Sequence, residues 1–187
     1  MLKTILVSIL FIVQIGLIVY CFRILFTMLF LVIYRKKQLP FVPTTPTVVR
    51  MIARSGAVQT GDTVIDLGCG TGTILIGLAR KIKNVRCIGI EQEQLLVVAG
   101  HLRSLFLRKR VQILRGDMFA YPLKDANVVV GFWVTELMPR IVEKIVAECT
   151  SGTRIVSHMF PLPEHPRLKL ENTITKRNHV VRVYAVV

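Results

Sequence analysis

The chain has 187 residues and a formal net charge of +14, which leaves room for one domain of ordinary size and one appendage. Its four cysteines form no C-x-x-C pair and have no histidine at zinc-like spacing. This spacing argues against a disulfide scaffold and a metal site and favours a reducing compartment. The positive charge predicts attraction to anionic surfaces, either lipid headgroups or nucleic acid, without choosing between them.

Residues 5–34 are almost continuously apolar and predict a single transmembrane helix. A bilayer core about 30 Å thick needs roughly 20 apolar helical residues, and this run is longer. A signal peptide would have a shorter apolar run and a small-x-small cleavage site, neither of which is visible. Arg35, Lys36 and Lys37 follow the run, so we expect a single-pass protein of the cell membrane, or of the inner mitochondrial membrane in a eukaryote, with its domain in the cytoplasm in the first case.

Three prolines make residues 38–47 a stiff linker, so the chain divides into an anchor with a basic flank (1–37), the linker, and a folded domain (48–187). Helix and strand signals alternate in this domain. We expect helices at 47–55, 73–83, 92–107 and 136–148, and strands at 63–67, 86–90, 111–114, 126–132 and 153–157. This alternation predicts an α/β fold with a mostly parallel sheet covered on both faces.

The last thirty residues have a different pattern. Two strand-like runs, 170–176 and 180–187, are separated by Arg177, Asn178 and His179. Such a pair of runs predicts a closing antiparallel hairpin.

A glycine-rich turn follows the first predicted strand, in V-I-D-L-G-C-G-T-G at 64–72. In an open parallel sheet the ligand lies beyond the carboxyl ends of the strands, and glycines in the first turn let the backbone approach it. Gly68, Gly70 and Gly72 follow G-x-G-x-G spacing, unlike the G-x-G-x-x-G of dinucleotide folds, and no G-K-[ST] follows. A phosphate-binding function is therefore disfavoured.

Acidic residues after three strands narrow the cofactor further. Asp66 would repel a pyrophosphate but can orient a cationic amino-acid group, and Glu91 has the position from which a carboxylate accepts hydrogen bonds from ribose hydroxyls. Asp117 can accept from an adenine amino group while the N–H of Met118 meets a ring nitrogen. The alternative is that the glycines only form a tight turn and the acids lie on a solvated edge, and Asp117 in particular suits an ordinary turn.

The combination of D-x-G-x-G-x-G, a strand-terminal Glu and then G-D resembles the class I methyltransferases over residues 46–157. The resemblance implies a Rossmann-like seven-stranded sheet, here preceded by one transmembrane helix, and S-adenosyl-L-methionine as cofactor. It implies binding of that cofactor by Asp66, Gly68, Cys69, Gly70, Gly72, Glu91, Gln92, Asp117 and Met118. Phe41 and Thr44 either cover the cofactor or belong to the stiff linker.

A narrower resemblance begins at P-F-V-P-T, residues 40–44. Together with Met138-Pro139, G-T-R-I-V-S at 152–157 and F-P-L-P at 160–163, it is similar to the membrane-anchored protein-lysine methyltransferases. In mitochondria these modify the adenine nucleotide translocase and the c-type rotor protein of the ATP synthase, and prokaryotic relatives exist. The C-terminal V-Y-A-V-V and the stretch G-F-W-V-T-E-L differ from that family and border the acceptor pocket, so the acceptor stays open.

Methyl transfer from a sulfonium depends mainly on alignment and exclusion of water. A lysine acceptor must be deprotonated, which an apolar channel beside a cationic cofactor promotes. The candidates for this channel follow the strand at 126–132 and are Phe132, Trp133, Thr135 and Glu136. Glu136 is equally well explained as an acidic first-turn residue of a helix.

We expect an enzyme that N-methylates lysine on a membrane-associated protein, because tethering raises the effective concentration of such a target. The expected partners are this protein and membrane lipid. The alternatives are a methyltransferase acting on a lipid-soluble small molecule and a non-catalytic membrane-tethered binding module.

Two groups of side chains receive no catalytic assignment. A basic cluster is expected to be a solvated or lipid-facing surface rather than a nucleic-acid site, and consists of Arg103, Arg108, Lys109, Arg110 and Arg115. Three histidines have no carboxylate or cysteine partner at informative spacing: His158, His165 and His179.

Overall fold

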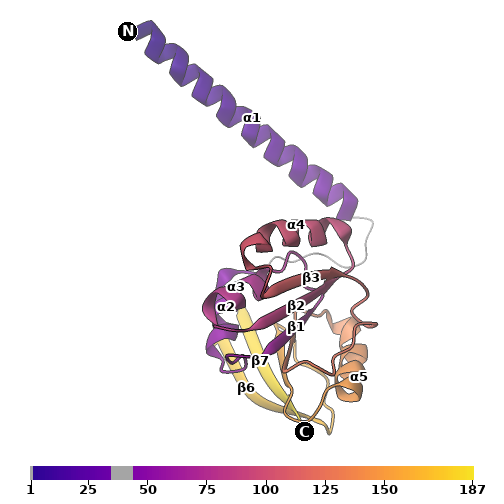
Figure 1. Cartoon of the computed structure of the whole chain (residues 1–187). Helices are drawn as coiled ribbons and strands as arrows, with labels where there is room; N and C mark the ends of the chain where they lie inside the picture. Colours follow the sequence, from indigo (N-terminus) through magenta and orange to yellow (C-terminus); the bar gives the residue numbers. More distant parts are fainter. Residues whose placement is uncertain (1, 35–43) are drawn as a thin grey trace. The chain divides into compact units, whose positions relative to one another are not determined.

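A computed structural model describes residues 2–34 and 44–187, which belong to two compact units, Met1–Val42 and Pro43–Val187. In the first unit, α1 (Leu2–Tyr34) is one continuous helix (Figure 1). Its segment Leu10–Met28 is long and apolar enough to cross a membrane, and its described side chains are exposed. The predicted basic flank and Phe41 lie outside the described residues.

The second unit is built on one seven-stranded sheet with the order β3-β2-β1-β4-β5-β7-β6 (Figure 1). The strands are β1 (Thr63–Leu67), β2 (Arg86–Glu91), β3 (Val111–Arg115), β4 (Val128–Gly131), β5 (Arg154–His158), β6 (Leu168–Lys176) and β7 (His179–Val186). The first five strands pair in parallel, whereas β7 is antiparallel to both β5 and β6. The predicted mostly parallel sheet with a closing hairpin is confirmed.

Helices lie on both faces of the sheet. One face carries α2 (Pro46–Arg54), α3 (Thr73–Lys81) and α4 (Gln94–Ser104), which a 3₁₀ turn, η1 (Leu105–Leu107), extends. The other face carries α5 (Met138–Glu148), which follows the 3₁₀ turn η2 (Thr135–Leu137). The described connections between β3 and β4 and between β5 and β6 contain no helix, so α5 and loops cover this second face.

Alternating side chains of the buried strands supply the two halves of the core. In β4, Val128 and Val130 pack toward α2 and α3, whereas Val129 packs toward α5. This is the period of two that a strand imposes, and it explains why strands buried on both faces are continuously apolar. Full burial of each such side chain contributes roughly 1.5–3 kcal/mol.

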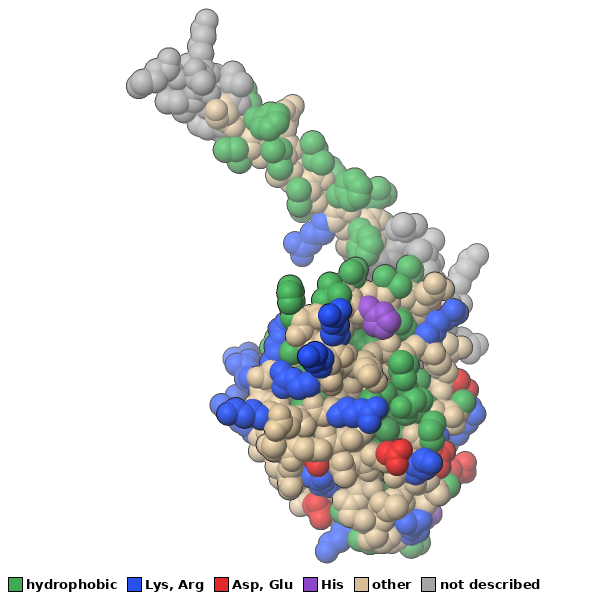
Figure 2. Space-filling view, viewed as in Figure 1, with side chains coloured by type: hydrophobic (Ala, Val, Ile, Leu, Met, Phe, Trp, Pro, Cys, Tyr) green, Lys and Arg blue, Asp and Glu red, His purple; other side chains and the backbone are tan. Residues whose placement is uncertain are grey.

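Several predicted boundaries need small corrections. α4 begins at Gln94 instead of residue 92, because the side chain of Glu91 accepts a hydrogen bond from the N–H of Glu93 and holds the chain in a turn (2.9 Å). The hairpin turn consists of Arg177 and Asn178 only, since His179 pairs with Lys176 as the first residue of β7. Lys and Arg are the prevailing charged side chains on the face of the second unit shown in Figure 2.

Candidate functional site

The glycine turn after β1 has the backbone geometry that the motif predicts. Gly68, Gly70 and Gly72 have φ angles of +84°, +56° and +72°, a region that residues with a Cβ rarely adopt. A Cβ on Gly72 would also lie 2.5 Å from Cδ1 of Ile113. The main-chain N–H groups of Gly68 and Cys69 both donate to the carbonyl of Ile90, at 2.9 and 3.0 Å, so the turn is fastened to the end of β2.

Glu91 ends β2 and also supports the turn. Its Oε2 accepts a hydrogen bond from the N–H of Gly70 and its Oε1 accepts one from the N–H of Glu93, each at 2.9 Å. A carboxylate has about four acceptor sites, so two such bonds leave capacity for the hydroxyls of a sugar. Glu91 therefore combines the predicted ligand position with a structural role that the sequence did not reveal.

Asp66 lies at the end of β1 with only 2% of its surface exposed. Burial, with a smaller contribution from the charge of Glu91, raises the pKa of this carboxyl to about 8. A carboxyl in this environment is stabilised in its ionised form by a nearby cation. A cofactor with a cationic amino-acid group fits this position, whereas a pyrophosphate does not.

Asp117 and Met118 reach the same edge of the sheet as the glycine turn. The N–H of Gly116 donates to the carbonyl of Glu91 at 3.0 Å, and a Cβ on Gly68 would lie 3.9 Å from Sδ of Met118. Asp117 is exposed, and its Oδ1 accepts a hydrogen bond from the N–H of Phe119 at 2.9 Å. We call Gly68, Gly70, Glu91 and Asp117 the cofactor edge.

Three other cofactor candidates from the sequence have different environments. Cys69 is buried, its N–H is bound within the turn, and burial raises the pKa of its thiol well above the ordinary value. Gln92 is exposed and directly follows Glu91. Thr44 is half-buried, while Phe41 lies outside the described residues.

Arg103 of α4 contributes to the turn, although its sequence context places it in the basic surface cluster. Its guanidinium donates to the main-chain carbonyl of Thr71 at 3.1 Å, to Oγ1 of Thr73 at 3.0 Å and to Oγ1 of Thr71. The interpretation of Arg103 as a purely solvated or lipid-facing residue is therefore wrong. Sequence separation hid this contact, because the partners are 30 or more residues apart.

The acceptor candidates after β4 have different positions. The side chain of Trp133 is 2% exposed and its Nε1–H donates to the carbonyl of Leu67 at 3.0 Å, so it belongs to the core instead of lining an open channel. Thr135 and Glu136 are exposed in η2. Phe132 is half-buried, and its ring lies toward the end of β5.

The neighbour of Phe132 is His158, a residue whose sequence spacing suggested no chemistry. Their ring centroids are 5.3 Å apart, and the ring of Phe160 is 6.0 Å from that of Phe132. Nε2 of His158 lies 3.4 Å from Nδ1 of His179, whose Nε2 is 3.2 Å from Oγ1 of Thr45. We call Phe132, His158, Phe160 and His179 the acceptor edge.

The ring of His158 is buried and stays uncharged. Burial, and to a smaller extent the charge of His179, lowers the pKa of His158 to about 4. Within the described parts of the chain, Nδ1 of His158 is buried and has no hydrogen-bond partner. Such a group costs about 1–3 kcal/mol and is uncommon in native structures outside functional sites. Its only sequence signal was its position at the end of a predicted strand.

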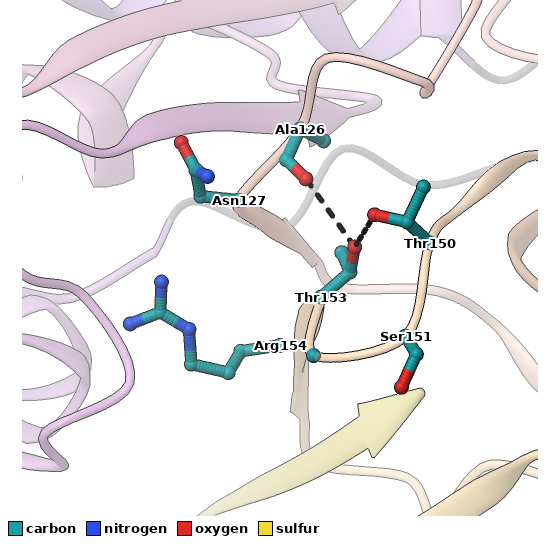
Figure 3. Close-up of a pocket in the computed structure, with 7 residues that line it drawn as sticks. Ala126, Asn127, Thr150, Ser151, Thr153 and Arg154 are labelled. Atoms are coloured by element: carbon teal, nitrogen blue, oxygen red, sulfur yellow. Dashed lines mark hydrogen bonds between the residues drawn. The ribbon is translucent and has the colours of Figure 1, made fainter. Parts of the chain in front are cut away.

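A pocket of about 190 Å³ lies at the opposite edge of the sheet (Figure 3). It surrounds the amino ends of β4 and β5, and its lining consists of Ala126, Asn127, Thr150, Ser151, Gly152, Thr153 and Arg154. Hydrogen bonds of Thr153 to Ala126 (3.4 Å) and Thr150 (3.5 Å) close the turn, and Arg154 pairs with Asp62 at 3.0 Å. This hollow is a structural turn, because ligands of such sheets bind at the carboxyl edge.

Comparison with known proteins agrees with this geometry. A protein-lysine N-methyltransferase of Saccharolobus islandicus is 30% identical over 152 residues, covering 80% of this chain and 94% of that protein. A Caenorhabditis elegans enzyme named as a lysine N-methyltransferase of the ATP synthase c-type protein is 31% identical over 158 residues, covering 80% and 82%. Among solved structures, an RNA methyltransferase from Salinibacter ruber in complex with S-adenosyl-L-homocysteine has a TM-score of 0.71 and 26% identity, covering 78% of this chain and 94% of that one.

The family described as the ANTKMT methyltransferase domain matches residues 66–169, which is more than half of the chain. This range begins at Asp66 and includes Glu91, Asp117 and His158. A buried carboxyl suited to a cation and a positive-φ glycine turn are the features that S-adenosylmethionine requires here. The chain therefore belongs to the ANTKMT methyltransferase domain family and is an S-adenosylmethionine-dependent methyltransferase.

Proposed function

We propose that this methyltransferase N-methylates a lysine side chain of a membrane-associated protein. The relatives from S. islandicus and C. elegans, both named as lysine N-methyltransferases, support a lysine acceptor. The observation that carries the proposal is the arrangement of the two edges. The cofactor edge lies beyond β1, β2 and β3, and the apolar acceptor edge lies beyond the adjacent strands β4, β5 and β7.

When bound, S-adenosylmethionine supplies an electrophilic methyl group. The glycine turn and Glu91 are the residues that would hold its nucleoside part, with Asp117 toward the adenine. Asp66 would face its cationic amino-acid part, since only a cation offsets the cost of ionising this buried carboxyl. Trp133 joins the two edges, because it follows β4 and donates to the carbonyl at the end of β1.

A lysine amine, with an ordinary pKa of about 10.4, attacks a methyl group only after it has lost its proton. The apolar rings of Phe132 and Phe160 would desolvate the amine and lower that pKa. His158 adds no positive charge that would repel the incoming ammonium, because its own pKa is lowered to about 4. The contact between Thr45 and His179 holds the segment before α2 against this edge, where it helps to exclude water.

The membrane part of the proposal rests on α1. A 19-residue segment of sufficient length and apolar character would tether the enzyme to the bilayer and raise the local concentration of a membrane-bound target. The predicted orientation, with the domain in the cytoplasm of a cell-membrane protein, rests on the basic residues 35–37.

The test is to incubate the purified full chain with methyl-labelled S-adenosylmethionine and a membrane fraction from its own cells. We expect label in protein that yields N-methyllysine on acid hydrolysis. Glu91→Gln should lose this labelling, and Glu143→Gln on the exposed side of α5 is the matched control. Label that enters only the organic extract would instead identify a small lipid-soluble acceptor, and label that enters only added RNA would identify a nucleic acid acceptor. Either result contradicts the proposal.

A further inference from the structure

One side of α4 and η1 carries a row of exposed apolar side chains. Its members are Leu95, Val98, Leu102, Leu105 and Phe106, with exposed fractions of 65%, 49%, 65%, 54% and 101%. We call them the α4 apolar face. Spacings of three and four residues place side chains on the same side of a helix. The buried residues of α4, among them Val97 and Gly100, lie on the opposite side and pack against the sheet.

Single exposed apolar residues are ordinary on protein surfaces, but a contiguous row marks an interaction site. Phe106 is the strongest member, because its side chain is as exposed as in an extended peptide. The core does not explain these residues, since α4 already buries Leu96 and Val97. Figure 2 shows hydrophobic side chains gathered over α4, with Lys and Arg beside them.

The charge around this face identifies its partner. Residues 94–116 contain no Asp or Glu. Arg103 and Arg110 contact the protein itself, at the glycine turn and at the carbonyl of Ile82, whereas Arg108 and Lys109 are exposed directly after Phe106. An apolar helix face bordered by Lys and Arg is the pattern of a helix that lies in a membrane interface, with its apolar side among the acyl chains and its cations at anionic headgroups.

We propose that the α4 apolar face docks into the surface of an anionic bilayer, with Phe106 inserted and Arg108 and Lys109 at the headgroups. The inference rests on the proposed function, in that the bilayer is the one to which α1 tethers the chain. A second attachment point would restrict the orientation of the catalytic domain on the membrane. Because Arg103 of the same helix contacts the glycine turn, the docked helix would directly adjoin the cofactor edge.

The experiment uses the full chain with Phe106→Trp, reconstituted into vesicles of phosphatidylcholine with phosphatidylserine. The native Trp133 is buried, so the unsubstituted protein measures its constant background. We expect lipids brominated on their acyl chains to quench most of the added emission. Leu170→Trp on β6, at a site that is 50% exposed, is the matched control and should stay unquenched.

Charge is tested in the same way. Quenching of Phe106→Trp should fall when phosphatidylserine is omitted, and Arg108→Gln with Lys109→Gln should reduce it to the same level in the anionic vesicles. Quenching of Phe106→Trp no greater than that of Leu170→Trp would overturn the docking proposal. So would a blue shift that depends on protein concentration and not on lipid, because a second copy of the chain would then cover the face.

Flotation of the vesicles separates this proposal from the membrane part of the proposed function. Protein that floats with the vesicles but is not quenched retains the tether and lacks only the docking. Protein that does not float refutes both. Binding of S-adenosylmethionine by each variant confirms that the domain is folded.

Discussion

At the scale of single residues, Asp66 links protonation to cofactor binding. Burial and the neighbouring Glu91 raise its pKa to about 8, so the carboxyl is protonated at neutral pH while no cation is near. A cationic ligand favours the ionised form, and the bound state must therefore release a proton whenever the pH is below 8. The affinity for S-adenosylmethionine should rise with pH in this range, by up to tenfold per unit.

The prediction is that Asp66→Asn removes this dependence. The dissociation constant, measured by calorimetry between pH 6 and 7.5, should decrease with rising pH in the natural protein and stay nearly level in the variant. Asp125→Asn, an exposed position, should behave like the natural protein. An unchanged pH dependence in Asp66→Asn would show that another group binds the proton.

His158 makes a second prediction, for stability. Its pKa is lowered from 6.5 to about 4 in the folded protein. As the pH falls below 6.5, the unfolded chain binds a proton at this ring and the folded chain does not, so the free energy of unfolding should fall by about 3 kcal/mol between pH 6.5 and 4. The loss should be much smaller in His158→Gln. Urea denaturation at each pH measures it, with His165→Gln as the control that retains the full loss.

At the scale of elements, the glycine turn depends on contacts from β2 and from α4. Ile90 and Glu91 of β2 accept hydrogen bonds from its N–H groups, while Arg103 of α4 donates to Thr71 and Thr73. The turn is therefore held in place before a ligand arrives. A preformed site loses less conformational entropy on binding.

Removal of the contact from α4 should weaken cofactor binding. We expect Arg103→Ala to raise the dissociation constant for S-adenosylmethionine about tenfold, or ~1.4 kcal/mol, because the turn loses the donors that hold Thr71 and Thr73. The effect is limited by the solvent exposure of Arg103. Arg80→Ala, at the exposed end of α3, should bind normally. Equal affinities of the two variants would refute the role of Arg103.

At the scale of the whole molecule, α1 and the catalytic domain have separate tasks. A charged residue at the centre of a membrane-spanning helix costs roughly 2.5–3.5 kcal/mol on insertion scales. The double change Leu17→Lys and Val19→Lys, within the apolar segment of α1, should therefore release the chain from membranes washed with carbonate. Binding of S-adenosylmethionine should be unaffected. Retention of the variant in the washed membranes would contradict the proposed span.

Local patterns in the sequence determined most of the fold and the cofactor edge. Strand and helix order followed from periodicity, and Gly68, Gly70, Gly72 and Glu91 were recognisable because their positions depend on one turn and on the strand before it. The backbone angles of the turn agree with that interpretation. Such features are visible in sequence because the interacting groups are close along the chain, or because each strand of a parallel sheet ends at the same edge.

The tertiary structure decided which side chains share an environment. Trp133 moved from the expected channel to the core because its N–H meets Leu67, 66 residues earlier, and Arg103 moved from the basic surface to the glycine turn. His158 acquired its neighbours Phe132 and His179 only through the pairing of β5 with β4 and β7. The sequence by itself determined the donor of the methyl group. The architecture of the acceptor edge depends on long-range packing, which no local pattern encodes.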